Sequence, residues 1–134
     1  MAGTKHSTDQ SCPFCPPPTE RIFYESDLVL AIWDGFPISR GHALVLPRQH
    51  VASWFRLSGE ERAEILVAIE AVRKAIEREH NPDGYNIGIN DGAAAGQTIP
   101  HLHVHVIPRY TGDVDDPRGG VRHVIPGKAD YWSR

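Results

Sequence analysis

The stretch Pro100-His101-Leu102-His103-Val104-His105-Val106-Ile107-Pro108 places a histidine at every second residue of an otherwise apolar run. Because side chains alternate across a strand, we expect His101–Ile107 to form one strand with three imidazoles on one face and the apolar residues in a core. Proline lacks an N–H and is rare inside a ladder, so the flanking prolines are expected to bound the strand. A wet edge strand is the alternative, but three histidines in strict register favour a strand that carries chemistry.

The loop before this strand, Asn90–Pro100, is built from small residues and ends in the polar pair Gln97 and Thr98. Small side chains let backbone N–H groups approach an anion closely, and consecutive amides can form a nest for phosphate oxygens. Such loops are also common connectors. Joined directly to the histidines, this loop predicts imidazoles that face a bound phosphoryl group.

Residues Gln97–Arg109 resemble the signature of the histidine triad (HIT) nucleotide hydrolases and transferases. Further matching segments occur in the same order as in that family, so the resemblance covers most of residues 12–112: they are Asp34, Gly41–Pro47, Arg48–His50 and Asn90–Gly92. Gln97 before the triad and Pro108–Asp113 after it are closer to the fragile-histidine-triad branch, which cleaves dinucleoside polyphosphates, than to the phosphoramidase branch.

The resemblance implies a role for each site residue. His103 would be the nucleophile that takes the nucleoside monophosphate group, since a neutral imidazole attacks with a free lone pair. His42 and His105 would contact the phosphate, and Gln97 and Thr98 would hold its oxygens or the leaving group. Asp34 would accept hydrogen bonds from the ribose hydroxyls. Asn90 would also contact the substrate. From the residues alone, His42 is more simply a strand-edge histidine, Asp34 a turn residue, and Thr98 and Asn90 ordinary loop polars.

Cys12-Pro13-Phe14-Cys15 contains the two cysteines of the chain. This spacing lets both thiolates reach one tetrahedral Zn²⁺, with two further ligands needed from elsewhere. The prolines that follow argue against the helix that activates redox thiols, and no secretion signal supports a disulfide. By resemblance to some bacterial HIT proteins, His50 and His101 would complete a structural zinc site, although a bare Cys-x-x-Cys can also be empty.

The order of the expected elements predicts an α+β fold with a mainly antiparallel five-stranded sheet, one long helix and a short helix, and the resemblance implies that this fold is HIT-like. The long helix is expected at Gly59–Glu79, where Ser58 and Glu61 form a capping box. Its apolar stripe consists of Ile65, Ile69, Val72 and Ile76. The expected strands are Ile22–Tyr24, Leu28–Trp33, His42–Leu46, Asn86–Ile89 and His101–Ile107. Family similarity adds a homodimer formed through the helix and neighbouring strand surfaces.

Length and composition bound the remaining possibilities. The chain has 134 residues, 40% of them hydrophobic, which is enough for the core of one domain. We expect a flexible segment at residues 1–11, a HIT domain at 12–112, as the resemblance implies, and an extension at 113–134 that packs on or near the active site. Fourteen basic against seventeen acidic residues give no electrostatic reason to expect a nucleic-acid partner. No apolar run approaches the ~20 residues of a membrane span, so a cytoplasmic protein is expected.

In the extension, Arg118 and Arg122, together with Arg109 before it, could bind the distal phosphates of a polyphosphate or be solvated charges. Tyr131 and Trp132 could stack on a nucleobase or belong to a mobile tail.

The expected function is therefore a nucleotide hydrolase that converts diadenosine polyphosphate to AMP plus the remaining nucleotide through a nucleotidyl-histidine. Any divalent cation would be carried by the substrate. The alternatives are a purine nucleoside phosphoramidase, a catalytic zinc hydrolase with three histidine ligands, and a nonenzymatic nucleotide-binding module.

Overall fold

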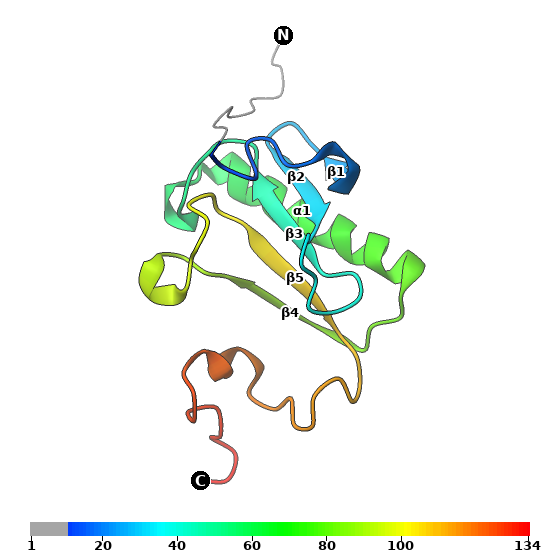
Figure 1. Ribbon diagram of the computed structural model, residues 1–134, viewed down its shortest axis with the longest axis vertical. Coiled ribbons are helices and arrows are strands. Elements are labelled where there is room, and N and C mark those ends of the chain that lie inside the picture. The colour runs from blue at the N-terminus through cyan, green and yellow to red at the C-terminus, as the bar shows by residue number, and fades with distance from the viewer. Residues whose placement is uncertain (1–10) are drawn as a thin grey trace.

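The computed structural model describes residues 11–134, which form a five-stranded antiparallel sheet with one α-helix packed against it (Figure 1). The strands are β1 (Ile22–Glu25), β2 (Val29–Trp33), β3 (Ala43–Pro47), β4 (Gly84–Ile89) and β5 (Val104–Arg109), in the spatial order β1-β2-β3-β5-β4. The helix is α1 (Gly59–Glu79), and the short helical elements are 3-10 turns: η1 (Thr19–Arg21), η2 (Trp54–Arg56), η3 (Ala93–Ala95) and η4 (Gly120–Val124). The α+β expectation is confirmed. The expected flexible segment at residues 1–11 lies outside the described residues apart from its last.

The helix α1 begins and ends where the sequence predicts. The Ser58 hydroxyl accepts a hydrogen bond from the Glu61 N–H at 3.0 Å, and the Glu61 carboxylate accepts one from the Ser58 N–H at 2.9 Å, which completes the capping box. Ile65, Val72 and Ile76 are fully buried against the sheet, whereas Ile69 is only partly buried. The apolar stripe therefore fixes which face of α1 meets the sheet.

Alternation along the strands gives the sheet two different faces. Ala31, Val45 and Val106 belong to the core beneath α1. On the opposite face, the side chains of β2 and β3 pack against the cysteine segment in a second buried cluster: Leu30, Ile32, Leu44 and Leu46 with Cys12, Phe14 and Cys15. His105 lies opposite Leu44 in the ladder, so this histidine of β5 projects from the face that α1 does not cover.

The bounds expected for the histidine strand are wrong at both ends. Strand β5 begins only at Val104, so the alternation does not extend to His101, which is fully buried. The preceding residues are fixed by other contacts: the Leu102 N–H donates to the Val51 carbonyl at 2.7 Å. Pro108 does not end the strand but lies within it. Its missing N–H is tolerated because β3 pairs with β5 only as far as Val106.

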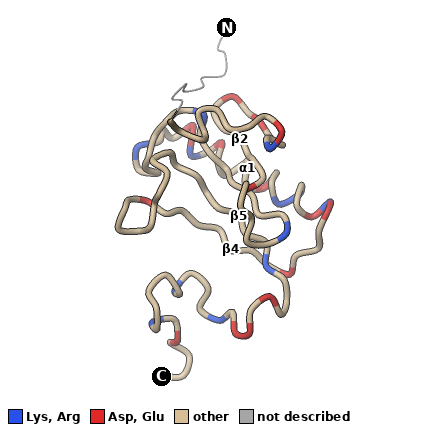
Figure 2. Tube along the Cα trace, viewed as in Figure 1, with Lys and Arg blue, Asp and Glu red and all other residues tan. Residues whose placement is uncertain are grey.

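The C-terminal segment, residues 113–134, continues beyond the sheet next to β4 (Figure 1, orange to red). Its approach to β4 is close, since a Cβ on Gly120 would lie 3.2 Å from the amide nitrogen of Asn86. Acidic and basic residues are interspersed along the trace (Figure 2). Across the described residues, no helix has the length and apolar character needed to cross a bilayer.

Candidate active site

His103 is held in one tautomer by the backbone of the residue two positions before it. Its Nδ1 lies 2.9 Å from the His101 carbonyl oxygen, which can only accept a hydrogen bond. The neutral ring therefore carries its proton on Nδ1 and keeps a lone pair on Nε2. The Phe14 ring packs against this imidazole edge-on, with centroids 5.2 Å apart. This fixed and half-buried nitrogen base is the residue that the sequence marks as the nucleophile.

His42, His105 and Asp34 form a hydrogen-bonded chain next to His103. The Ile38 N–H donates to His42 Nδ1 at 3.2 Å, so the proton of the neutral His42 ring is on Nε2. That Nε2 lies 3.0 Å from His105 Nδ1 and 3.3 Å from an Asp34 carboxylate oxygen. His105 Nδ1 is then an acceptor, which leaves the N–H of the neutral His105 ring at Nε2. These hydrogen bonds therefore leave the Nε2–H of His105 available to donate to an anionic ligand.

Burial keeps these two imidazoles uncharged. It lowers the pKa of His105 from 6.5 to about 4, helped by the neighbouring His103 and His42 and opposed by Asp34. Burial also lowers the pKa of His42, with the Asp34 carboxylate opposing the shift. Both rings are therefore neutral at pH 7, as the tautomers above require.

His103 lines a pocket of about 410 Å³, here called the Phe14 pocket. It is lined by residues from the cysteine segment, η1, β3, the loops after β2 and before β5, and two histidines: Pro13, Phe14, Arg21, Asp34, Gly35, Phe36, Leu44, Asn90, Gly96, Gln97, Thr98, Ile99, His103 and His105. Asp34, Asn90 and Thr98 are thus brought to His103 as the sequence predicts. Phe14 was missed as a pocket residue, and its position between two cysteines gave no signal of that role.

The side chain of Gln97 forms hydrogen bonds within the loop Asn90–Pro100 and to Ala52, which lies outside this loop. Its amide oxygen accepts from the Gly92 N–H at 2.8 Å, and its amide nitrogen donates to the carbonyls of Ala52 at 2.9 Å and Ile99 at 3.1 Å. The loop Asn90–Pro100 is therefore shaped by Gln97, while the exposed Thr98 borders the pocket.

A second pocket of about 560 Å³, the β4 pocket, lies on the other side of His105. It is lined by residues of β4, β5, the loop after β2 and η4: Asp34, Phe36, Ile38, His42, Asn86, Ile87, Gly88, Ile89, Asn90, His105, Ile107, Gly120, Val121 and Val124. The sequence gave no signal for the contribution of η4, because its apolar residues follow a turn-rich stretch without periodicity.

The cysteines and two further residues form a separate group that could hold a metal ion. The ligand atoms of Cys12, Cys15, His50 and His101 all lie within 4.8 Å of one another. His101 Nδ1 is 3.4 Å and 3.2 Å from the two sulfurs, and His50 Nδ1 is 3.2 Å from the Cys15 sulfur. Two thiols and two imidazoles are a donor set that suits tetrahedral Zn²⁺.

The surroundings of His101 fit metal binding as well. Its Nε2 donates to the Pro47 carbonyl at 2.8 Å, which leaves the Nδ1 lone pair directed at the sulfurs. Burial lowers the pKa of His101 to about 4 and so keeps the ring in the neutral, ligating form. The Phe14 N–H also donates to the Cys12 sulfur at 3.4 Å.

The three triad histidines do not converge on one point. His101 belongs to the cysteine group, and His105 groups with Asp34 and His42. His103 belongs to neither group of candidate ligands in the described part of the chain. This geometry disfavours the catalytic zinc site with three histidine ligands.

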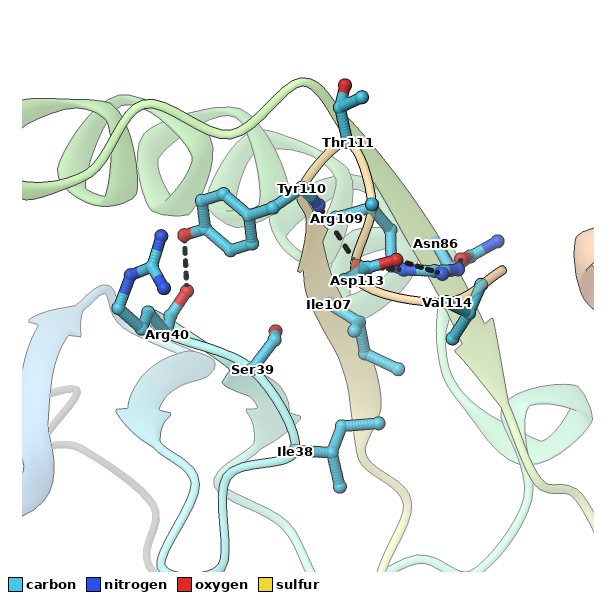
Figure 3. A pocket seen from close by; sticks show the side chains of 11 residues that line it. Ile38, Ser39, Arg40, Asn86, Ile107, Arg109, Tyr110, Thr111, Asp113 and Val114 are labelled. Carbon is cyan, nitrogen blue, oxygen red and sulfur yellow. Dashed lines mark hydrogen bonds and ion pairs between the residues drawn. The ribbon is translucent and has the colours of Figure 1, made fainter. Parts of the chain in front are cut away.

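The three arginines considered for polyphosphate binding are engaged within the chain. Arg109 forms an ion pair with Asp113 at 2.8 Å and a hydrogen bond to Asn86 at 2.6 Å, on the wall of a groove next to the β4 pocket (Figure 3). Arg118 pairs with Asp116 and stacks on Trp132, and Arg122 donates to backbone carbonyls and lies over Tyr131. These arginines and the two aromatic rings therefore hold the C-terminal segment together.

Comparison with known proteins finds one family model and several relatives that match most of this chain. A model of the HIT domain family matches residues 18–112. The bis(5'-nucleosyl)-tetraphosphatase [asymmetrical] of Schizosaccharomyces pombe is 37% identical over 100 residues, which are 75% of this chain and 55% of that protein. The bis(5'-adenosyl)-triphosphatase of Saccharomyces cerevisiae is 34% identical over 115 residues, which are 85% of this chain and 53% of that protein. The chain thus spans about half the length of these two relatives.

Among solved structures, a Zn-bound histidine triad family protein from Mycobacterium smegmatis is similar to this chain. The two share 38% sequence identity and superpose with a TM-score of 0.69 over 77% of this chain and 78% of the other.

Proposed function

The chain belongs to the HIT domain family, and from this premise we propose that it is a nucleotide hydrolase that cleaves dinucleoside polyphosphates through a covalent intermediate on His103. The observation that carries the proposal is the tautomer of His103, whose Nδ1 is occupied by the His101 carbonyl and whose Nε2 lone pair is available for attack. Two relatives are named as hydrolases of such substrates.

In the first step, the Nε2 lone pair of His103 forms a bond to the α-phosphorus. The bond from phosphorus to the bridging oxygen breaks, and its electron pair leaves with that oxygen as part of a nucleotide anion. The ring then carries a positive charge, which the Nδ1–H shares with the His101 carbonyl. In the second step, the oxygen of a water molecule forms a bond to phosphorus. The bond from phosphorus to Nε2 breaks, and its electron pair returns to Nε2. The water releases one proton as the nucleoside monophosphate forms.

The neighbouring residues would stabilise the phosphoryl group during both steps. His105 would donate its Nε2–H to an equatorial oxygen, since its Nδ1 is taken by His42. Thr98 and the backbone of the loop before it border the same pocket and would hold further oxygens. Asp34 would accept hydrogen bonds from the ribose hydroxyls through a carboxylate that also accepts the Phe36 N–H at 2.7 Å. Asn90 lines both pockets and would contact the substrate.

We further propose a structural zinc ion bound by Cys12, Cys15, His50 and His101. Zinc would supply no chemistry to the reaction but would fix the cysteine segment, and with it Phe14, against the sheet. A divalent cation bound to the phosphates of the substrate is compatible with the site.

The proposed assembly is a homodimer formed through α1 and β4. It is supported by the exposure of Leu66 and Val67 on α1, at 62% each, and by the position of β4 at the edge of the sheet. The location in the cytoplasm stays a prediction from the sequence.

The test is product analysis after incubation of the wild type and His103→Ala with diadenosine tetraphosphate and, separately, with adenosine phosphoramidate. We expect the wild type alone to release AMP, with faster turnover of the tetraphosphate. Faster turnover of the phosphoramidate would instead assign phosphoramidase activity. Binding of AMP without turnover of either substrate would identify a binding module.

A further inference from the structure

Two pockets meet at His105. The Phe14 pocket and the β4 pocket share four lining residues, which are Asp34, Phe36, Asn90 and His105. His103 lines only the first pocket, and His42 lines only the second. The rings of His103 and His105 are 5.0 Å apart and those of His105 and His42 are 5.2 Å apart, so the three imidazoles lead from one pocket to the other.

The β4 pocket has the size and lining of a binding site for a flat, partly apolar group. Its volume of about 560 Å³ falls within the ~300–1,000 Å³ typical of small-molecule sites. Two segments, the loop after β2 and η4, line it with exposed apolar side chains, with exposures of 74% for Ile38, 65% for Val121 and 74% for Val124. Exposed apolar groups that gather around one hollow mark a binding surface. The amides of Asn86 and Asn90 add donors and acceptors suited to the edge of a nucleobase.

Resting on the proposed hydrolase function, we infer that the β4 pocket binds the second nucleoside of the substrate. With the first nucleoside in the Phe14 pocket, the leaving group departs from phosphorus on the side opposite His103 Nε2. The oxygen that takes the electron pair of the broken bond belongs to the departing nucleotide. The remaining phosphates of this nucleotide lie next to His105 and His42. Its nucleoside then reaches the apolar walls beyond them. The chain would thus favour substrates with two nucleosides over phosphoramidates, whose leaving group is an amine.

Part of this pocket lies outside the residues that match the family model. Gly120, Val121 and Val124 belong to η4, whereas the match ends at residue 112. The segment is fixed by Arg122, which donates to the Ala129 carbonyl at 3.1 Å and the Lys128 carbonyl at 2.9 Å. Preference for the second nucleoside would therefore be a property of this C-terminal segment and not of the HIT domain alone.

The test compares two non-hydrolysable methylene-bridged ligands, an analogue of diadenosine tetraphosphate and one of adenosine tetraphosphate, which lacks the second nucleoside and has a free terminal phosphate in its place. Calorimetry with the wild type should give about tenfold tighter binding of the dinucleoside ligand. In Val124→Asp, and independently in Val121→Asp, this ratio should fall to about one because a carboxylate now faces the base. Ile125→Asp changes the adjacent residue, which is 57% exposed and outside the pocket, and should keep the wild-type ratio.

Equal affinities in the wild type, or an unchanged ratio in both pocket variants, would overturn the inference. Size-exclusion chromatography of the same variants tests a second copy of the chain as occupant, and loss of a dimer in Val124→Asp alone would also overturn it. Turnover of unmodified diadenosine tetraphosphate is measured separately. A preserved binding ratio without turnover would reject the hydrolase but retain the nucleoside site.

Discussion

The Nδ1 atom of His103 lies 2.9 Å from the carbonyl oxygen of His101, so a residue of the candidate metal group fixes the tautomer of the proposed nucleophile. The same residue therefore belongs to two sites. The imidazole of His101 contacts the cysteine sulfurs, and its backbone carbonyl contacts His103, the proposed nucleophile.

The lone pair on His103 Nε2 predicts the stereochemistry of the reaction. Attack by histidine and then by water gives two in-line displacements at phosphorus, each of which inverts the configuration. A substrate made chiral at the α-phosphorus with sulfur and an oxygen isotope should therefore give a nucleotide with retained configuration, as determined by phosphorus NMR. Inverted configuration would show direct attack by water and exclude the covalent intermediate.

The buried imidazoles predict a loss of stability in acid. Burial lowers the pKa of His105 from 6.5 to about 4 in the folded protein. Neutral His105 therefore stabilises the fold fully above about pH 6.5, and this contribution is lost as the pH falls toward 4. Urea unfolding at pH 7 and pH 5 should show a smaller decrease in the free energy of unfolding for His105→Asn than for the wild type. His123→Asn removes an exposed histidine and is the matched control.

The three hydrogen bonds of Gln97 predict a role in shaping the loop Asn90–Pro100. Gln97→Ala should lower the free energy of unfolding by roughly 1–2 kcal/mol. The catalytic efficiency kcat/KM should fall with it, by about tenfold, because the loop that borders the Phe14 pocket loses its internal support. Thr98→Ala, at an exposed neighbouring position, should lower kcat/KM without this loss of stability. If Gln97→Ala reduced kcat and left stability unchanged, direct contact with the leaving group would be the better explanation.

The exposed pair on α1 predicts a dimer that a single charge can disrupt. Leu66→Glu places a carboxylate at a position that is 62% exposed in the single chain and would be buried between two helices. Sedimentation should show a dimer for the wild type and mainly monomer for this variant. Val114→Glu, an exposed apolar residue in the C-terminal segment, should remain dimeric. A monomeric wild type would contradict the proposed assembly.

The sequence predicts most of the fold because the signals involved are local. The capping residues Ser58 and Glu61 specify where α1 begins, and the apolar spacing specifies its buried face. The start of β5 could not be predicted, because His101 leaves the ladder through long-range contacts with Pro47 and the cysteines. The β4 pocket was also missed, since it forms only when η4 meets β4 in three dimensions. The shared phosphate-contacting role expected for His42 and His105 came from resemblance, whereas their mutual hydrogen bond and their tautomers required the structure.

The candidate metal group makes a prediction that joins stability to ligand binding. The purified protein should contain about one zinc per chain, and a strong chelator should lower Tm by at least about 5 °C, equivalent to roughly 1–2 kcal/mol. Cys12→Ser should reproduce this loss, whereas His80→Ala, a histidine outside the group, should not. Because Phe14 lies between the two cysteines and lines the Phe14 pocket, where the nucleotide is proposed to bind, the metal-free protein should also bind AMP more weakly. A metal-free protein with unchanged Tm and AMP affinity would show that the thiols and imidazoles hold this segment without a metal ion.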